Sequence, residues 1–342
     1  MNVKQPLVSV MTPMYNVENY LERTLDSLAN QTYPNCEFIL CDDGSTDDTL
    51  LIAQSFADND PRFVVLQHAE NRGNGAGQNT CLNYALDPNR EYKPKYIAFC
   101  DHDDIMHSDL IEHCVGKMQT HDVQTAEMLL LNYCTADVHF ENTPPMPIPF
   151  DLSGGKLFSA QNDATLVMFP PPPWAKFYDA DFIRKNNIRF TENKGLQYPD
   201  IGWGIKCAAF CRYYAYTPNV LYTHFVNRAK SISTQNSLTS TILNEYYPLQ
   251  EFFSEYNLHG TVTSVANAFH AFTFYYGEYL QGERNLQEAT LFAKYFSNEI
   301  AFGNFDEAVL RAAIAETKLP FVITADTIDS YVDYMTGLKK QL

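Results

Sequence analysis

The first 135 residues alternate between short apolar runs and amphipathic segments, and this alternation limits the possible folds more than any other feature of the chain. The apolar runs have the length of buried strands, and the segments between them carry apolar residues at helical spacing. We therefore expect a mainly parallel α/β sheet with helices on both faces. The predicted strands are Leu7–Thr12, Cys36–Cys41, Phe63–Gln67, Tyr96–Cys100 and Met128–Cys134, and the predicted helices are Asn19–Ala29, Thr46–Ala57, Gly75–Leu86 and Asp109–Thr120.

The remainder of the chain begins with proline-rich stretches and ends in helical segments. Asn142–Phe150 is rich in proline and Phe169–Trp174 contains four consecutive prolines, so neither stretch can form a helix. Asp179–Asn186 has helical spacing, and from about Leu238 the chain becomes helical with aromatic stripes. The predicted division is an α/β domain at 1–235, with halves at 1–135 and 136–235, followed by a helical C-terminal region at 236–342.

The chain is strongly acidic, and this excludes one class of partner. Its 24 Lys and Arg residues stand against 41 Asp and Glu residues, which gives a formal charge of −17. Nucleic-acid binding needs a basic surface that displaces counterions from phosphates, so we expect no nucleic-acid partner. An acidic chain can instead hold a divalent cation where its carboxylates cluster.

No segment predicts export or membrane insertion. Met1–Gln5 is polar and leads into a strand-like run without a small-residue cleavage site. The longest membrane candidate, Met128–Leu131, is far shorter than the ~18 residues of a membrane span. The eight cysteines are scattered through apolar segments, so we expect reduced, buried thiols in a cytoplasmic protein.

Three acidic groups fall where a sheet of this kind places its ligand. Asp42–Asp47 follows the second predicted strand, Asp101–Asp104 follows the fourth, and Asp200 stands in a later segment. Ligands bind beyond the carboxyl ends of such strands. Turn and cap chemistry is the favoured interpretation of Asp47. The carboxylates of Asp101–Asp104 repel one another unless a cation neutralises them, which indicates Mg²⁺ or Mn²⁺ bound with substrate phosphates.

Two loops add weaker signals to the same site. Tyr15, directly after the first strand, could offer a flat face to a nucleotide base. The glycine-rich loop Asn71–Gly77 lacks the spacing of a P-loop and is weak evidence for phosphate contact.

These residues together resemble the family 2 glycosyltransferases, inverting enzymes of the GT-A fold. The matching stretch reads PLVSVMTPMYNVENYLERTLDSLANQTYPNCEFILCDDGSTDDT and continues through ENRGNGAGQN to YIAFCDHDDIMHSDLIE. Several separate motifs occur in the family's order over about 110 residues, and a weaker match extends the resemblance to residues 6–235. It implies a GT-A fold, a nucleotide-sugar donor and synthesis of bacterial polysaccharide or another glycan.

The resemblance also implies roles for residues of the first half. Pro13 and Tyr15 match the loop around the nucleotide base, and Glu18 matches an acid often found there. The second acid of the pair Asp42–Asp43 matches the aspartate that hydrogen-bonds the base, normally uracil.

The family's Asp-x-Asp region matches Asp101, Asp103 and Asp104. One acid of that region contacts the ribose and another holds Mn²⁺ or Mg²⁺ on the diphosphate. The sequence leaves open which acid does which, with Asp103 and Asp104 as the metal candidates. Asp200 matches the general base, although Pro199 replaces the glutamate that usually precedes it.

Other positions depart from the family pattern or match it only loosely. Gln78 stands where the family often has an arginine, and Arg72 is a candidate to supply that charge to the diphosphate. Arg228 resembles part of a loop near the diphosphate, although a solvated turn is an equal alternative. We interpret His224 as a core or supporting histidine in preference to a metal ligand.

The expected activity is metal-dependent transfer of a sugar, with inversion, from a nucleotide diphosphate to a hydroxyl of a glycan or lipid-linked glycan. A lipid-linked acceptor would place the enzyme at the inner face of the cell membrane. The alternatives are a nucleotidyltransferase, disfavoured by the loop after the first strand, and a catalytically weak or inactive nucleotide-sugar binding protein. The aromatic stripe from Phe269 to Tyr279 is compatible with a homodimer or lipid surface, although burial within the tail is favoured.

Overall fold

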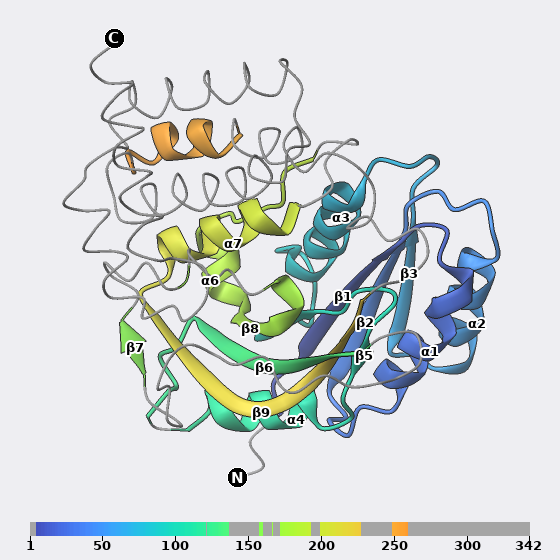
Figure 1. Cartoon of the computed structure of the whole chain (residues 1–342), viewed down its shortest axis with the longest axis horizontal. Helices are drawn as coiled ribbons and strands as arrows, with labels where there is room; N and C mark the ends of the chain where they lie inside the picture. Colours follow the sequence, from blue (N-terminus) through green and yellow to red (C-terminus); the bar gives the residue numbers. More distant parts are fainter. Residues whose placement is uncertain are drawn as a thin grey trace, which may run out of the picture.

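A computed structural model describes residues 5–120, 122–136, 157–159, 166, 172–192, 199–226 and 248–258 of the chain. Across these residues, nine strands form one mixed sheet in the order β3-β2-β1-β4-β8-β6-β9-β5, with β7 paired to β9 (Figure 1). Arg228, the stretch Asn142–Phe150 and nearly all of the predicted helical tail lie outside the described residues.

The first half of the chain forms the parallel part of the sheet, as the alternating pattern predicts. β1 (Val8–Met14) lies between β2 (Cys36–Asp42) and β4 (Tyr96–Phe99), and β3 (Phe63–Gln67) pairs with β2, all in parallel. Every residue of β1 and β4 is buried, because helices cover both faces of such a sheet. The carboxyl ends of these strands meet at one edge of the sheet, where the acidic turns follow them.

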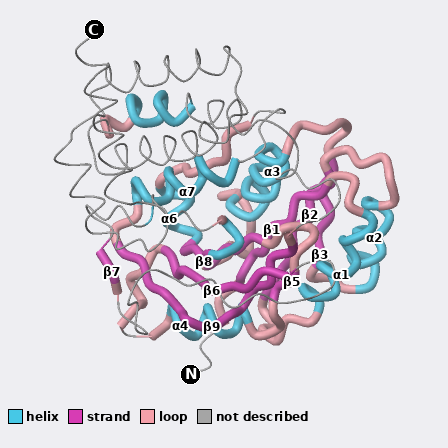
Figure 2. The backbone as a smooth tube through the Cα atoms, in the orientation of Figure 1, coloured by secondary structure: helices cyan, strands magenta, loops and turns pink. Residues whose placement is uncertain are grey.

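The helices of this half connect the parallel strands across the two faces. α1 (Glu18–Ala29), α2 (Thr49–Asn59) and α4 (Leu110–Met118) lie on one face, and α3 (Asn74–Leu86) lies on the other (Figure 2). α2 begins three residues later than the sequence predicts, because the Asp47 carboxylate accepts the backbone N–H of Thr49 at 3.0 Å. This is the turn role that the sequence favoured for Asp47.

Beyond β4 the sheet is mixed, so the mainly parallel prediction holds only for the first half. β8 (Lys176–Asp179) runs antiparallel between β4 and β6 (Met128–Ala136). β9 (Tyr213–Phe225) runs parallel to β6 and continues into an antiparallel pairing with the two-residue strand β5 (Ile105–Met106). The short strand β7 (Phe158–Ser159) pairs with the other end of β9.

The long strand β9 brings residues of the second half (136–235) back to the acidic turn after β4. With 13 residues it spans the width of the second half, and its last residues pair with β5, which directly follows Asp104 (Figure 1). Chain segments more than 100 residues apart therefore meet at the edge where the parallel strands end.

Two helices of the second half pack over β8, on the same face as α3 (Figure 1). The first of them, α6 (Ala180–Lys185), directly follows β8. A 3₁₀ helix, η1 (Pro173–Ala175), directly precedes β8. α7 (Pro199–Phe210) is tied to β8 by a 2.9 Å hydrogen bond that the Trp203 indole donates to the Tyr178 hydroxyl.

A described piece of the C-terminal region packs against the end of α7. Phe210 makes edge contacts with Phe252 and Tyr256, whose rings lie 5.4 and 5.0 Å from it. Residues 248–255 are helical, and Leu249 and Phe253 are buried. This piece agrees with the helical character that the sequence predicts for the tail.

The remaining sequence predictions on cysteines and membranes can be compared with the described residues. All eight cysteines are buried and their thiols are free, as expected for reduced cysteines that pack as small apolar side chains. Among the helices that the structure describes, none combines the length and the apolar character that crossing a membrane requires.

Candidate active site

The turn after β2 uses its two carboxylates to organise neighbouring loops. Asp43 is 3% exposed and accepts the backbone N–H groups of Arg72 at 2.9 Å and Gly73 at 2.7 Å. His68 approaches the same carboxylate at 2.6 Å. Asp42 is fully buried and accepts the backbone N–H of Ser45. Asp43 thus holds the glycine-rich loop in place next to the turn.

The glycines of that loop are required by close packing. A Cβ atom on Gly75 would lie 2.2 Å from the Thr191 carbonyl oxygen, and one on Gly77 would lie 2.9 Å from the Pro13 side chain. The Arg72 guanidinium pairs with Glu192 at 3.2 Å on the surface. The loop therefore joins β1 to the segment after α6, and its arginine is engaged by a carboxylate.

The loop after β1 presents one exposed aromatic ring. Tyr15 is 42% exposed, and Asn16 beside it has a left-handed backbone with a φ of 52°. The Asn16 side chain accepts the backbone N–H of Thr46 at 2.8 Å, which holds this conformation. Glu18 accepts the backbone N–H of Asp48 at 3.0 Å and so caps the entry to α2. Tyr15 is thus open to a ligand, whereas Glu18 has a structural contact.

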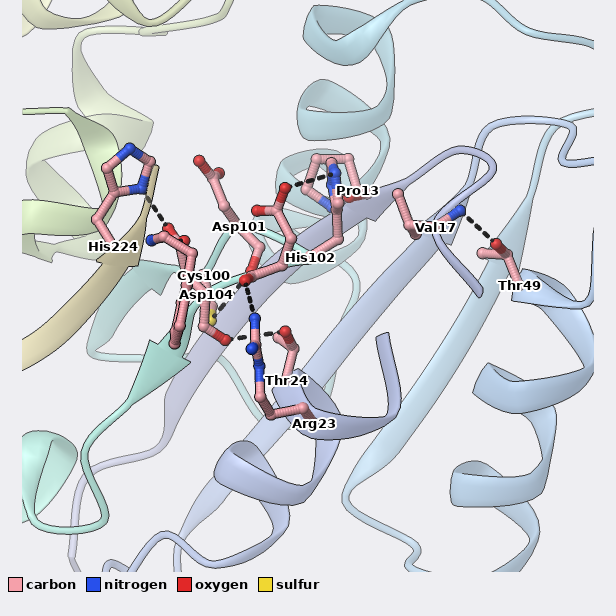
Figure 3. A network of polar contacts seen from close by, with 12 residues as sticks. Pro13, Val17, Arg23, Thr24, Thr49, Cys100, Asp101, His102, Asp104 and His224 are labelled. Atoms are coloured by element: carbon pink, nitrogen blue, oxygen red, sulfur yellow. Dashed lines mark hydrogen bonds and ion pairs between the residues drawn. The ribbon is translucent and has the colours of Figure 1, made fainter. Parts of the chain in front are cut away.

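The turn after β4 is built around the buried carboxylate of Asp104, as Figure 3 shows. Asp104 is fully buried, and its Oδ2 accepts the Tyr222 hydroxyl at 2.9 Å and His224 Nδ1 at 2.9 Å. Its Oδ1 accepts the backbone N–H of Phe225 at 2.8 Å. Each oxygen of Asp104 is therefore already engaged by β9.

The aromatic rings behind His224 fix its position. Trp174 stacks on Tyr222 with ring centroids 4.6 Å apart, and on His224 with centroids 4.8 Å apart. The Asp104 contact uses Nδ1, and no described residue hydrogen-bonds Nε2. Burial lowers the pKa of His224, but its hydrogen bond and charge interaction with Asp104 outweigh burial and raise it overall. The histidine thus has one oriented nitrogen left for a ligand.

The backbone of the acidic turn is held from both sides. Arg23 on α1, labelled in Figure 3, donates to the Asp103 carbonyl at 2.7 Å. Its guanidinium also lies 3.8 Å from the centre of the Phe225 ring. The His102 ring donates to the Pro13 carbonyl at 3.0 Å. The Asp101 N–H donates to the Tyr222 hydroxyl at 3.0 Å. These contacts fix where the side chains of Asp101 and Asp103 begin.

The Asp101 carboxylate lies where several charges meet. Burial, followed by the charge of Asp104, raises the pKa of Asp101 to about 6, while His102 and His224 oppose that rise. Asp200 also acts on the Asp101 carboxyl. The electrostatic link shows that the first turn of α7 reaches the turn after β4, so the structure brings these two predicted site residues together.

Asp200 lies in the first turn of α7 above a buried lysine. Burial raises the pKa of the Asp200 carboxyl, and the charges of Lys176 and His224 oppose the rise. Lys176 is 1% exposed, and burial lowers its pKa to about 8. On β8, Lys176 shares a face with Tyr178, which binds Trp203, and Trp203 lies one helical turn from Asp200. The lysine therefore lies under the helix face that carries Asp200.

The sequence analysis missed three residues of this site. Lys176, Trp174 and Tyr222 all lie in runs that look like ordinary apolar strands and loops. Lys176 alone gives a signal in the sequence. Lysine is rarely buried, so a lysine within an aromatic, strand-like run is unusual and indicates a special position.

The donor set partly fits a divalent cation. Asp101 and Asp103 supply the hard oxygen atoms, and His224 supplies an oriented nitrogen. Asp104 has both oxygens hydrogen-bonded, so it fits better as the residue that orients the histidine. Among the described residues, no three His, Cys, Asp or Glu side chains converge closely enough to form a metal centre by themselves. A cation here would need oxygen atoms from a ligand as well.

Comparisons of sequence show relatives among glycosyltransferases. The model of glycosyl transferase family 2 matches residues 9–156. The glycosyltransferase GlyA of Streptococcus pneumoniae is 36% identical over 119 residues, which cover 35% of this chain and only 16% of GlyA. EpsH of Bacillus subtilis is 27% identical over 261 residues, which cover 75% of this chain and 71% of EpsH.

Comparisons of structure extend the likeness over nearly the whole chain. Staphylococcus aureus TarS 1–349, in a complex with UDP-GlcNAc, has a TM-score of 0.67 at 19% identity and covers 95% of this chain and 91% of its own. The mannosyltransferase PcManGT of Pyrobaculum calidifontis, in a complex with GDP-Man and Mn²⁺, has a TM-score of 0.51 at 16% identity, with coverages of 92% and 88%. The fold is thus that of the GT-A-type glycosyltransferases, as predicted. Residues 9–156 match the model of glycosyl transferase family 2, which supports the family that the sequence resembles.

Proposed function

We propose that this protein transfers a sugar from a nucleoside diphosphate donor to an acceptor hydroxyl, with inversion at the anomeric carbon. The observation that carries this proposal is the meeting of Asp101, Asp200 and His224 at the carboxyl edge of the sheet. They come from a turn, a helix and a strand, and their charges interact. Asp200 raises and His224 lowers the pKa of Asp101, and His224 also lowers that of Asp200. Such clusters of perturbed groups in an open sheet edge mark reaction sites.

UDP is the donor nucleotide that we propose. TarS, which shares the fold, was solved with UDP-GlcNAc and with UDP. In this chain the exposed ring of Tyr15 lies beside the turn of Asp42 and Asp43, where a base would stack. The contact of Asp43 with the base stays a prediction. The acceptor that we propose is a glycan or lipid-linked glycan, reached from the cytoplasmic side.

Asp200 is the group that we assign as general base. An inverting transfer needs one carboxylate that takes the proton from the attacking hydroxyl while the diphosphate leaves. Burial raises the pKa of Asp200 toward the range where a base works well, and Lys176 beneath it limits the rise. The first turn of α7 holds the carboxylate in place, so the acceptor meets a fixed base.

A divalent cation, Mn²⁺ or Mg²⁺, completes the proposal. We assign Asp103 and His224 to its binding, and Asp101 to the ribose or the cation, with Asp104 fixing the imidazole. When bound, the cation would neutralise the charge that develops on the diphosphate. PcManGT, a more distant structural neighbour, was solved with Mn²⁺. The carboxylate oxygens of Asp101 and Asp103 and the free nitrogen of His224 support this proposal.

The first experiment measures donor turnover and donor binding in the same protein. Asp200→Asn should lower the rate of sugar transfer by about 10²- to 10⁴-fold, because the amide cannot accept the proton. Calorimetric binding of UDP with Mn²⁺ should stay within about twofold of the wild-type value. Asp181→Asn is the matched control, since Asp181 also lies in the first turn of a helix but on the surface.

Two outcomes would contradict the proposal. Transfer that survives Asp200→Asn would remove Asp200 from the role of base. Wild-type protein that binds no nucleoside diphosphate, with or without Mn²⁺, would instead favour an inactive member of the family.

A further inference from the structure

Gln78 has a buried side-chain oxygen without a hydrogen-bond partner among the described residues. The side chain lies in the second turn of α3 and is 3% exposed. Its carbonyl oxygen Oε1 is buried and accepts no hydrogen bond from any residue that the structure describes. Buried carbonyl oxygens in native proteins nearly always have a partner, because an unmet one is costly. An exception therefore points to a group that binds there.

The neighbours of Gln78 on α3 show which way it faces. Gly77 faces Pro13 on β1, and Asn79 donates to the Phe190 carbonyl at 3.0 Å. At 100° per residue, Gln78 lies between these two directions and away from Thr80, which contacts His68 after β3. In the strand order β3-β2-β1-β4, the side of β1 that lies away from β3 is the side of β4. Gln78 therefore lies on the β4 side of α3.

The direction along the helix agrees with this placement. Side chains on a helix tilt toward its N-terminus, and α3 begins right after the loop that Asp43 holds at the carboxyl edge of the sheet. Gln78 thus lies on the side of α3 that faces the carboxyl end of β4, where Asp101 follows.

The chemistry of the lone oxygen selects the part of the donor that it can contact. A carbonyl oxygen only accepts hydrogen bonds, and the diphosphate of a nucleotide offers acceptor oxygens alone. The transferred sugar, by contrast, offers hydroxyl groups and, in an N-acetyl sugar, an amide N–H. A neutral amide also brings no charge to a diphosphate.

We propose that Gln78 is a specificity residue for the donor sugar, whose Oε1 accepts a hydrogen bond from a hydroxyl or amide N–H of that sugar. This inference rests on the proposed function, because it assumes a nucleotide sugar at the carboxyl edge. It assigns to Gln78 the recognition of the sugar and leaves the nucleotide to other residues.

The test compares UDP with UDP sugars in wild-type protein and in Gln78→Met. Calorimetry with Mn²⁺ gives Kd for UDP, UDP-GlcNAc and UDP-glucose. The ratio of Kd for UDP to Kd for the tighter UDP sugar should fall about fivefold or more in Gln78→Met, because one hydrogen bond is lost. Kd for UDP should change by less than about twofold.

A stability measurement separates this role from a structural one. Methionine fills a similar volume without an unmet carbonyl, so the unliganded variant should melt about 2–4 °C higher than wild type. Gln31→Met is the matched control, because Gln31 is also buried but donates to the His107 carbonyl at 2.7 Å and accepts the Ile111 N–H. That variant should melt lower and keep the wild-type Kd ratio.

The outcomes distinguish the inference from the function beneath it. An unchanged Kd ratio in both Gln78→Met and Gln78→Leu would overturn the inference, as would an equal loss of UDP and UDP-sugar binding. The variant also identifies the group that Gln78 binds. If it loses more affinity for UDP-GlcNAc, Oε1 accepts the amide N–H. If it loses more affinity for UDP-glucose, Oε1 accepts a hydroxyl. Wild-type protein that binds no nucleoside diphosphate would overturn the proposed function itself, and this inference with it.

Discussion

The turns after β2 and after β4 look alike in sequence but are used differently. Each begins with an aspartate at the carboxyl end of a parallel strand and contains a buried carboxylate. After β2, Asp43 binds backbone N–H groups of the glycine-rich loop in its own half. After β4, Asp104 binds Tyr222, His224 and Phe225 of β9, more than 100 residues away.

The first turn therefore has a structural task, whereas the second turn contributes to the proposed reaction site. The turn after β2 is complete within the first half of the chain and holds the glycine-rich loop. The turn after β4 binds a histidine from the second half, and the charge of Asp200 on α7 acts on Asp101. Of the two turns, the second is therefore the one to which we assign cation binding and proton transfer.

The largest expected effects come from removing each buried carboxylate in turn. Asp43→Asn and Asp104→Asn should each lower the free energy of unfolding by about 2–4 kcal/mol, because buried donors lose a charged acceptor. Asp104→Asn should in addition weaken Mn²⁺ binding about 10- to 100-fold, since His224 loses its orientation. Urea unfolding and Mn²⁺ titrations in the presence of UDP measure both. Equal loss of Mn²⁺ affinity in the two variants would erase the contrast between the turns.

The packing of the glycine-rich loop gives the next effect. Gly75→Ala should destabilise the protein by about 1–3 kcal/mol, because its Cβ would lie 2.2 Å from the Thr191 carbonyl oxygen. Gly116→Ala is the control. Gly116 lies on the exposed side of α4 with nothing within 4 Å of an added Cβ, so this change should stabilise the helix by about 0.5–1 kcal/mol. Thermal unfolding of both variants checks the sign. Tolerance of Gly75→Ala would show that the loop moves freely against the second half.

The charge under Asp200 should appear in the pH profile of transfer. Lys176 lowers the pKa of Asp200, so Lys176→Met should move the acid limb of the rate profile upward by roughly 1 pH unit. Asp200 must be deprotonated to act as the base. Lys176→Met should therefore lower the transfer rate at acid pH and leave the maximum rate at higher pH unchanged. Lys95→Met, which removes a lysine from a surface pair with Asp179, should leave the limb in place. An unshifted limb in Lys176→Met would exclude its action on the base.

The smallest expected effect tests whether Glu18 contacts the nucleotide, as the family resemblance implies, or only caps α2. Glu18→Ala should cost about 0.5–1 kcal/mol of stability, because the Asp48 N–H loses its acceptor. If the cap is its whole contribution, Kd for UDP stays within twofold by calorimetry. A loss of fivefold or more would support the contact with the nucleotide loop that the family resemblance implies.

Much of the first half could be predicted from local patterns. The strand at Phe63–Gln67 has the predicted ends, and the neighbouring elements differ by one to three residues, where capping contacts decide the boundary. The second half was predicted less well. β8 and β9 were not predicted. β8 has only four residues and follows a run of prolines, and β9 is interrupted by Pro218, so neither strand shows a clean period.

The site shows the same division at the level of single residues. The acids at strand ends were found because turns after parallel strands gather at one edge. The roles of Asp104 and His224 were less clear, since a carboxylate that binds a cation and one that binds a histidine look identical in sequence. Gln78 stood out in the sequence only as a departure from the family pattern. The burial of Gln78 and of Lys176, which one sequence does not report, gave both residues their place in the site.

The sequence by itself determined the parallel α/β half, the acidic edge and the family, because those depend on periodicity and on motifs a few residues long. The tertiary structure decided which acids already have partners within the fold. Asp43 and Asp104 are saturated by N–H and O–H donors, whereas Asp101 is buried near the charges of Asp104, His224 and Asp200. That choice depends on β9 and α7, whose contacts with the first half span more than 100 residues and leave no local pattern.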